Sequence, residues 1–205
     1  SNQALNDLLT TLGIPNFDPV RADIAQAILT YHVATSIVLS SDLGVGNTIA
    51  TLQGENITVG AGPVLESGAT LDAEFITTDL IATNGAVHIV DYVLVPPTIG
   101  DVIVDNLGTL AQPILLASDF SILADAISQK ADVYAEANDL PLLIDVLGNR
   151  ANPGADYTVF APNNDVFVAA GIGLDDLTGE QWYGTIAKHV GVGIYEAGDL
   201  TTGTE

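Results

Sequence analysis

The sequence of 205 residues combines 26 acidic side chains with only four basic ones, so its formal net charge is −22. A surface of this sign repels nucleic acid phosphates and anionic lipid headgroups, which excludes nucleic acid and anionic membranes as partners. Cysteine is absent, which excludes disulfides and thiolate sites, and no apolar run reaches the roughly 18 residues that a bilayer requires, so we expect no membrane insertion by this segment.

A first helix is predicted at residues 18–30. Asp18 is a typical N-cap residue, and Pro19 suits the first helical position because its ring already holds the helical φ angle. Ile24 and Ile28 then lie one turn apart. This spacing gives the helix an apolar face that must pack against the rest of the domain.

The middle of the first half is predicted to form strands. Residues 49–59 alternate around a turn, and residues 75–82 form a further extended segment. Asn84-Gly85 favours the positive φ angles of a tight hairpin turn. Residues 86–95 return from this turn with apolar side chains on both faces, which predicts a central strand. Pro96-Pro97 ends the strand because proline cannot donate to a ladder.

The second half again begins with helices and adds one strand. Residues 118–127 predict a helix, and another begins within residues 139–144. Residues 157–160 predict a short strand. Thr178 and Gln181 form a capping box, which starts a last helix.

One phrase of the sequence occurs twice. Tyr31-His32-Val33, with Ile37 and Asp42-Leu43 at fixed spacing, returns as Lys188-His189-Val190 with Ile194 and Asp199-Leu200. His32 and His189 are 157 residues apart, and no gap interrupts the match. A repeat of this period indicates tandem domains. Because the phrase lies near the start of one copy and at the end of the other, we expect neither domain to be complete here.

Two further motifs accompany the repeated phrase. DYTVFAPNNDVF at residues 156–167 resembles the first signature of the fasciclin (FAS1) domain family, and NGAVHIVDYVLVPP at residues 84–97 resembles the second. In that family the His-Val phrase lies between these signatures. The sequence is therefore similar to a tandem fasciclin-like surface protein. The resemblance implies an α+β fold, a β-wedge or sandwich with packed helices, repeated in tandem.

The resemblance also sets the expected domain limits. Residues 1–5 align with residues 163–167, so the chain enters its first domain within the first signature. We expect 1–98 to be the C-terminal part of one fasciclin-like domain and 99–205 the N-terminal part of the next. The first domain then needs a covering strand. Residues 157–160 of the same or another chain are expected to supply it, unless residues outside this sequence do so.

The sequence shows no catalytic constellation, and we predict that the chain is not an enzyme. No serine lies in a G-x-S-x-G elbow or at S-x-x-K spacing, and the carboxylates of Asp175-Asp176 are expected to face water. His32, His88 and His189 have no second ligand at helical spacing, so no metal site is predicted. Each imidazole is expected to bond backbone groups in a core. Neither a calcium loop nor a phosphate loop is present, and no cofactor is predicted.

The resemblance points to one candidate binding site. A tyrosine-histidine stretch is implicated in integrin-mediated adhesion by animal fasciclin-like proteins, and Tyr31 and His32 match it. In the second copy Lys188 precedes His189, which weakens the match there. The competing interpretation is structural, because Tyr31 and His32 end an amphipathic helix whose apolar face must pack.

The function implied by the resemblance is that of a non-catalytic adhesion or matrix module, secreted or at the cell surface. Its expected partners are cell-surface or matrix proteins, or polysaccharide. The alternative is a structural subunit of an extracellular fibre, which self-associates because neighbouring chains complete its incomplete domains. Stoichiometry distinguishes the two functions: an adhesion module stays monomeric in dilute solution, whereas a fibre subunit does not.

Overall fold

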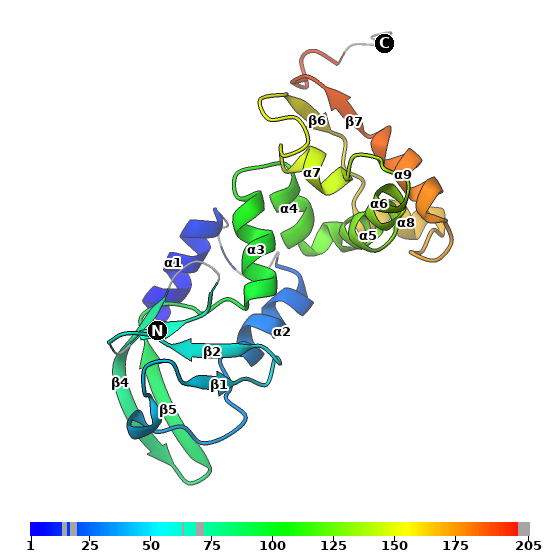
Figure 1. The fold of residues 1–205 in the computed structure, drawn as a ribbon. Helices are drawn as coiled ribbons and strands as arrows, with labels where there is room; N and C mark the ends of the chain where they lie inside the picture. The colour runs from blue at the N-terminus through cyan, green and yellow to red at the C-terminus, as the bar shows by residue number, and fades with distance from the viewer. Residues whose placement is uncertain (14–15, 17–19, 63, 69–71, 201–205) are drawn as a thin grey trace. The chain divides into compact units, whose positions relative to one another are not determined.

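The structure, a computed structural model, describes residues 1–13, 16, 20–62, 64–68 and 72–200. The chain forms two compact units, Ser1–Leu107 (unit 1) and Gly108–Glu205 (unit 2). Both units combine helices with antiparallel strands, which confirms the predicted α+β class (Figure 1). The assignment of 1–98 and 99–205 to parts of two successive fasciclin domains stays a prediction.

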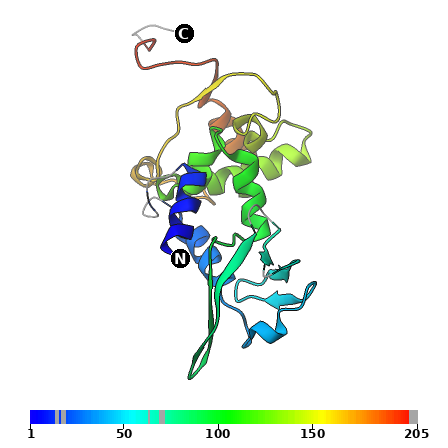
Figure 2. The same ribbon diagram turned by 90° about the vertical axis from the view of Figure 1, so that its left-hand side faces the viewer.

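Unit 1 starts with helices, continues with strands and ends with a helix. Its elements are α1 (Asn2–Leu12), α2 (Ala22–Tyr31), η1 (Ser40–Asp42), β1 (Thr48–Ala50), β2 (Asn56–Val59), β3 (Val64–Glu66), β4 (Ala73–Ala82), β5 (Gly85–Val90) and α3 (Pro97–Asn106). The strands form one antiparallel sheet in the order β1-β2-β3-β4-β5. The β4–β5 hairpin extends beyond the shorter strands of this sheet (Figures 1 and 2).

The segment that follows α2 also joins the sheet of unit 1. Ala34 forms an isolated antiparallel bridge with Thr51, directly after β1. On either side of this bridge, the Thr35 N–H donates to the Ala50 C=O at 2.9 Å and the Leu52 N–H donates to the Val33 C=O at 2.7 Å. Within the described residues, the strands of unit 1 therefore run from this segment at one edge to β5 at the other.

Helix α2 packs through the apolar face that the sequence predicts. Ile28 and Tyr31 are buried, and Arg21 precedes the helix as an N-cap residue whose side chain pairs with Asp23 instead of capping the helix. Positions 18 and 19, at which the sequence predicts the helix start, lie outside the described residues.

The core of unit 1 forms around Tyr31. Its side chain is 0% exposed, and the phenol donates a hydrogen bond to the Asn56 C=O at 3.0 Å. Burial, with a smaller contribution from the charge of Glu55, raises the pKa of Tyr31 to about 12. The buried residues around it are Ile57, Val59, Leu65, Ala73 and Leu94. This contact fastens the end of α2 to β2.

The prediction of a central strand at residues 86–95 is wrong. β5 ends at Val90 and lies at the edge of the sheet within the described residues. Val87 and Ile89 remain exposed there. The apolar character of both faces suggested a neighbour on each side, but the described residues provide a neighbour on one side only.

The predicted conformation of the β4–β5 turn is also wrong. Asn84 and Gly85 do not have positive φ angles. The left-handed residue is instead Asp79, with φ of 59°, and it lies where the register of β4 against β5 shifts between Thr77 and Leu80. The positive φ angle therefore belongs to a β-bulge within β4 and not to the turn at the tip of the hairpin.

Unit 2 is mostly helical and contains one short two-stranded sheet. Its elements are α4 (Ala111–Leu116), η2 (Ser118–Phe120), α5 (Ser121–Ala126), the π-helical turn η3 (Ile127–Ala131), α6 (Asp132–Ala137), α7 (Leu143–Leu147), β6 (Tyr157–Val159), α8 (Asn164–Ala170), α9 (Gly179–Ala187) and β7 (Val190–Val192). β6 pairs with β7 in a sheet separate from that of unit 1. The strand predicted at 157–160 is confirmed, but it does not complete the sheet of unit 1 within this chain.

The core of unit 2 forms around Trp182 in α9. The indole is 1% exposed, lies 5.7 Å from the Phe167 ring between centroids, and donates through Nε1 to the Leu174 C=O at 3.0 Å. The predicted capping box is confirmed, because Thr178 accepts from the Gln181 N–H while the Gln181 side chain accepts from the Thr178 N–H.

A buried carboxylate connects two helices of unit 2. Asp132, in α6, accepts hydrogen bonds from the Leu143 N–H at 2.6 Å and the Ile144 N–H at 3.1 Å. These donors belong to the first turn of α7, whose own N-cap residue, Leu142, offers no side-chain acceptor. Desolvation by burial raises the pKa of Asp132, although the two hydrogen bonds act in the opposite direction. Asp132 therefore caps α7 from another helix.

We predict that Asp132→Ala lowers the free energy of unfolding of unit 2 by about 1–3 kcal/mol, because it leaves two N–H groups of α7 without an acceptor. Asp132→Asn retains a carbonyl oxygen and is expected to cost less. Urea denaturation followed by Trp182 fluorescence measures both losses in the same core. An Asp132→Ala variant as stable as the original chain would contradict this role.

Candidate functional site

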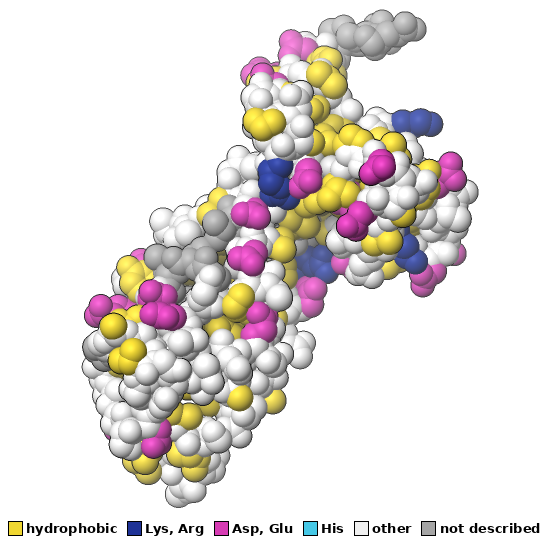
Figure 3. Space-filling model, in the orientation of Figure 1, with side chains coloured by type: hydrophobic (Ala, Val, Ile, Leu, Met, Phe, Trp, Pro, Cys, Tyr) yellow, Lys and Arg dark blue, Asp and Glu magenta, His cyan; other side chains and the backbone are white. Residues whose placement is uncertain are grey.

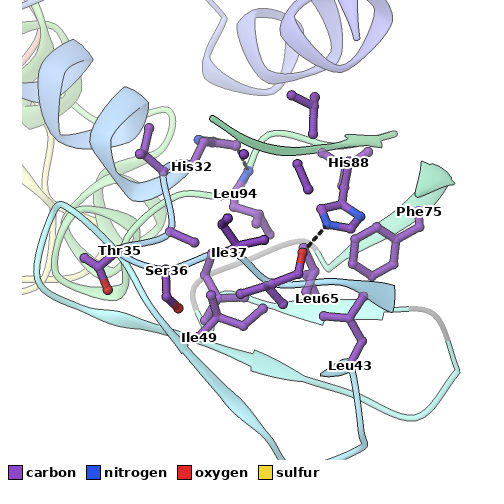
Figure 4. A pocket seen from close by; sticks show the side chains of 18 of the residues that line it. His32, Thr35, Ser36, Ile37, Leu43, Ile49, Leu65, Phe75, His88 and Leu94 are labelled. Carbon is purple, nitrogen blue, oxygen red and sulfur yellow. Dashed lines mark hydrogen bonds between the residues drawn. The ribbon is translucent and has the colours of Figure 1, made fainter. Parts of the chain in front are cut away.

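Unit 1 contains an apolar cavity of about 560 Å³ between the segment that follows α2 and the β4–β5 hairpin. Residues 32–38 form one wall, and Val87, His88 and Val90 of β5 contribute the opposite wall. The hairpin turn at residues 84–86 and the side chains of Leu43, Ile49, Ile57, Leu65, Phe75 and Leu94 line the rest. Figure 4 labels most of these side chains. The cavity is thus bounded by the two edges of the sheet.

His32 holds one end of this cavity. It is the C-cap residue of α2, and its Nδ1 lies 2.7 Å from the Ile28 C=O. Its Nε2 accepts a hydrogen bond from the Leu94 N–H at 3.0 Å. A ring nitrogen that accepts carries no proton, so Nδ1 must be the donor to Ile28, and the imidazole is neutral.

The surroundings of His32 oppose its protonation. Desolvation of the ring lowers the pKa of His32 below the ordinary value of 6.5, and this effect exceeds the opposing effect of the hydrogen bond to Ile28. The prediction of a backbone-bonded imidazole is confirmed. The prediction that His32 is buried is wrong, because the residue as a whole is exposed, although its hydrogen bonds to Ile28 and Leu94 are partly buried.

His88 holds the opposite end of the cavity by the same chemistry. Its Nε2 lies 2.9 Å from the Val38 C=O, and its Nδ1 accepts from the Asp79 N–H at 3.4 Å. The Phe75 ring packs against it edge-on with centroids 5.6 Å apart. His88 therefore links the wall at 32–38 to β5, and the dashed line in Figure 4 marks this link.

The bulge in β4 makes the His88 contact available. Asp79 turns its N–H towards His88, and its carboxylate accepts hydrogen bonds from the Ser40 N–H at 2.8 Å and from the Ser40 hydroxyl. These hydrogen bonds lower the pKa of Asp79. Aspartate tolerates the left-handed conformation better than most residues. One residue thus connects η1, β4 and β5.

The structure separates the two candidate adhesion residues. Tyr31 lies in the core and offers no surface to a partner, whereas His32 lines the cavity. The sequence did not identify Ile37 and Phe75 as neighbours of this site, because the contacts between segments far apart in the chain carry no local signal. His88 was noted as a strand residue, but its link to Val38 depends on the bulge.

The remaining residues that the sequence singles out lie in unit 2 and do not line the cavity. Asp175 accepts from the Lys130 ammonium at 2.7 Å, which lowers the pKa of Asp175, and Asp176 accepts from the Gly173 N–H at 2.6 Å. His189 is only partly buried, and within the described residues its ring makes no hydrogen bond, so the predicted backbone-bonded core imidazole is wrong for His189. Among the residues that the structure describes, no group of three or more His, Asp or Glu side chains is arranged to hold a metal ion.

The cavity is suited to binding rather than to catalysis. Both imidazoles that line it are committed to backbone groups, so neither is positioned to activate a nucleophile. The lining is mainly aliphatic and aromatic.

We predict that His32→Ala lowers the free energy of unfolding of unit 1 by about 1–3 kcal/mol at pH 8, since the buried N–H of Leu94 loses its acceptor. Because the pKa of His32 is lower in the folded state, the unfolded chain takes up the proton first as pH falls below 6.5. The stabilisation by His32 is therefore lost on acidification. The difference between the original chain and His32→Ala should shrink from pH 8 to pH 5.

Urea denaturation monitored by circular dichroism measures this difference, and amide hydrogen exchange of Leu94 reports the hydrogen bond itself. Exchange at Leu94 should accelerate in His32→Ala. A difference in stability that grows on acidification, or exchange that is unchanged, would refute the assignment of Nε2 as an acceptor.

A model of the family described as Fasciclin domain matches residues 1–96. The chain is 36% identical over 81 residues to Protein sll1483 of Synechocystis, which covers 38% of this chain and 42% of that protein. It is 22% identical over 160 residues to human periostin, which covers 74% of this chain and 15% of periostin. The chain thus spans less than half the length of either relative.

A solved FAS1 domain pair from the insect cell adhesion molecule Fasciclin I aligns with 98% of this chain and 66% of its own length, at 19% identity and a TM-score of 0.34. Fasciclin domains are extracellular, adhesion-related modules of a non-enzymatic family. No helix in the described parts of the chain has both the length and the apolar character needed to cross a bilayer. Residues 1–96 of this chain therefore match the fasciclin domain family.

Proposed function

We propose that the chain is a non-catalytic adhesion or matrix module, secreted or displayed at the cell surface, and that its partner is another protein. The observation that carries this proposal is the fasciclin domain in residues 1–96, because that family consists of adhesion-related extracellular modules. The cavity in the same residues supports it, since both of its histidines serve the fold and leave a surface for binding.

The β4–β5 hairpin offers a surface for such a partner. On its two faces together it exposes the large aliphatic side chains of Ile76, Leu80, Ile81, Val87 and Ile89, which we call the hairpin surface. Exposed apolar side chains gathered on one element mark interaction sites more often than isolated ones do. Apolar side chains lie at the surface in the lower part of Figure 3, where Figure 1 places this hairpin.

The chemistry of the hairpin surface favours a protein over a polysaccharide. Its side chains are aliphatic and present no hydrogen-bonding groups to sugar hydroxyls. The two acidic residues elsewhere on the hairpin, Glu74 and Asp79, and the net charge of −22 repel anionic polysaccharides. Apolar area surrounded by polar groups is typical of the centre of protein interfaces.

We propose that Tyr31 and His32 contribute to adhesion by holding neighbouring segments in place, and not by contacting the partner. Tyr31 fastens the end of α2 through Asn56, and His32 fixes the start of the segment 33–38 through Leu94. Replacing either residue would then impair adhesion by disturbing the cavity and the adjacent hairpin rather than by removing a contact with the partner.

A second candidate function is a structural subunit of an extracellular fibre, completed by neighbouring chains. The observation that favours it is the edge position of β5, whose outer side has no strand partner among the described residues. Unpaired edges with exposed apolar side chains tend to pair with other chains.

The adhesion proposal predicts that Ile81→Asp weakens binding without affecting the fold. Ile81 is 69% exposed and does not line the cavity, so a carboxylate there opposes apolar contact at no cost to the core. Val45→Asp is the matched control, because Val45 is 70% exposed in unit 1 but lies outside the hairpin surface. Cultured fibroblasts are counted on plates coated with each protein, with albumin-coated plates as the baseline.

We expect cells to adhere above the baseline to the original chain and to Val45→Asp, and severalfold less to Ile81→Asp. Equal adhesion to Ile81→Asp would reject the hairpin surface. Retention of the chain on insoluble cellulose without cell adhesion would favour polysaccharide as the partner, and release of soluble sugars would show an enzyme.

A further inference from the structure

The repeated phrase pairs with a different neighbour in each unit. The repeated phrase places residues 33–36 of unit 1 in the positions of residues 190–193 of unit 2. In unit 2, these residues include β7 and pair with β6. In unit 1, they pair with the chain after β1 through the Ala34–Thr51 bridge. The equivalent segments of the two units therefore form backbone hydrogen bonds along opposite edges.

The hydrogen-bond pattern of unit 2 shows which backbone groups face β6. The Phe160 N–H donates to the His189 C=O at 2.9 Å, and the Gly193 N–H donates to the Asp156 C=O at 2.8 Å. Opposed residues of an antiparallel ladder alternate between hydrogen-bonded and non-bonded pairs. Gly191 lies midway, opposite Thr158. Its N–H and C=O therefore point to β6.

The equivalent groups of unit 1 point away from β1. Val33 and Thr35 use their C=O and N–H on the β1 side, so alternation turns the N–H and C=O of Ala34 the other way. Ala34 is the counterpart of Gly191. Among the described residues, no hydrogen bond engages the Ala34 N–H or C=O, or the Ser36 N–H. Unit 1 thus presents an open strand edge with the polarity that accepts β6 in unit 2.

The open edge of residues 33–36 and the outer edge of β5 border the same cavity. Both segments line it, and the His88–Val38 hydrogen bond joins them at one end. Val33, Ile37 and Val87 line the cavity while remaining exposed. In Figure 4, Thr35 and Ser36 lie on one side of the opening, and Phe75 and His88 lie on the other. One strand between these edges would have a partner on each side.

We propose that this cavity is an acceptor site for an extended strand, and that residues 156–160 of a second copy of this chain occupy it. These residues already pair with the equivalent phrase in unit 2, and every copy carries them. In unit 2 β6 has one strand partner, β7. In the acceptor site it would have two strand partners, residues 33–36 and β5, and it would cover the exposed side chains of the cavity. Addition of a strand to an open edge is an established mode of chain association.

The register of the docked strand follows from the repeat. Thr158 lies opposite Ala34, and Phe160 and Asp156 lie opposite His32 and Ser36, as they do opposite Gly191, His189 and Gly193 in unit 2. The contact differs between the two molecules, one giving β6 and the other receiving it, so it is a strand exchange that joins two or more copies.

This inference deepens the fibre-subunit proposal, and its first test does not depend on assembly. A fluorescent peptide with the sequence of residues 155–162, ADYTVFAP, is titrated with the full chain, and its anisotropy is measured. A peptide with Thr158→Pro is the matched control, because proline lacks the N–H that pairs with the Ala34 C=O.

Ile37→Asp in the protein places a carboxylate in the cavity lining at a residue that is 65% exposed, and Val45→Asp again serves as its control. We expect the peptide to bind the original chain and Val45→Asp, and to bind Ile37→Asp about tenfold more weakly or worse. Thr158→Pro should weaken the peptide similarly. Equal circular dichroism spectra and melting curves of the two protein variants show that both are folded.

The second test addresses the second copy. The full chain is equilibrated in mild urea so that β6 can leave β7, returned to buffer, and examined by sedimentation velocity over a range of concentrations. We expect concentration-dependent assemblies that Ile37→Asp abolishes and that the free peptide dissociates. Failure of the peptide to bind would overturn the acceptor site. A chain that binds the peptide but remains monomeric at every concentration would overturn the assignment of a second copy as the occupant, and leave the adhesion proposal unaffected.

Discussion

The hydrogen bond from the Leu94 N–H to His32 Nε2 is the constraint on which the site of unit 1 depends. It connects the end of α2 to the chain that returns after β5. Because Nε2 accepts, Nδ1 donates to Ile28, and the imidazole spans two backbone segments as a neutral ring. The neighbouring Tyr31 fixes the same helix end from the other direction through Asn56. The position of residues 33–38 follows from these two contacts.

His88 repeats this arrangement at the other wall of the cavity. It joins Val38 to the bulge at Asp79, so an imidazole holds the spacing between the open edge of residues 33–36 and β5. The cavity is therefore a consequence of how the two sheet edges are held apart. The ring nitrogens of both histidines are paired with backbone groups, so the polar groups that this wall leaves open are those of the backbone at Ala34 and Ser36.

The sequence predicted the local elements well where a short pattern determines them. The capping box at Thr178 and Gln181, the apolar face around Ile28, and the short strand before Ala161-Pro162 were all confirmed. These features depend on residues three or four apart, or on alternation over a few positions. The α+β class followed from the presence of both patterns.

The sequence did not predict the structural features that depend on contacts between distant segments. The apolar faces of residues 86–95 suggested a central strand, but whether a neighbour is present is not a property of the strand itself. The bulge at Asp79 is stabilised by Ser40, which is far away in the chain. The chemistry of His32 was correctly predicted as backbone bonding, whereas its exposure was not, because the cavity beside it forms only when residues 33–38 and the hairpin are both in place.

The most direct test of this account is the tautomer of His32 in the folded chain at neutral pH. Nitrogen-15 spectra of the imidazole distinguish a protonated ring nitrogen from an unprotonated one, and a coupling across the hydrogen bond identifies the Leu94 N–H as the donor. The account predicts a neutral ring with the proton on Nδ1 and a coupling from Leu94 to Nε2. A ring protonated at Nε2, or without coupling to Leu94, would contradict it.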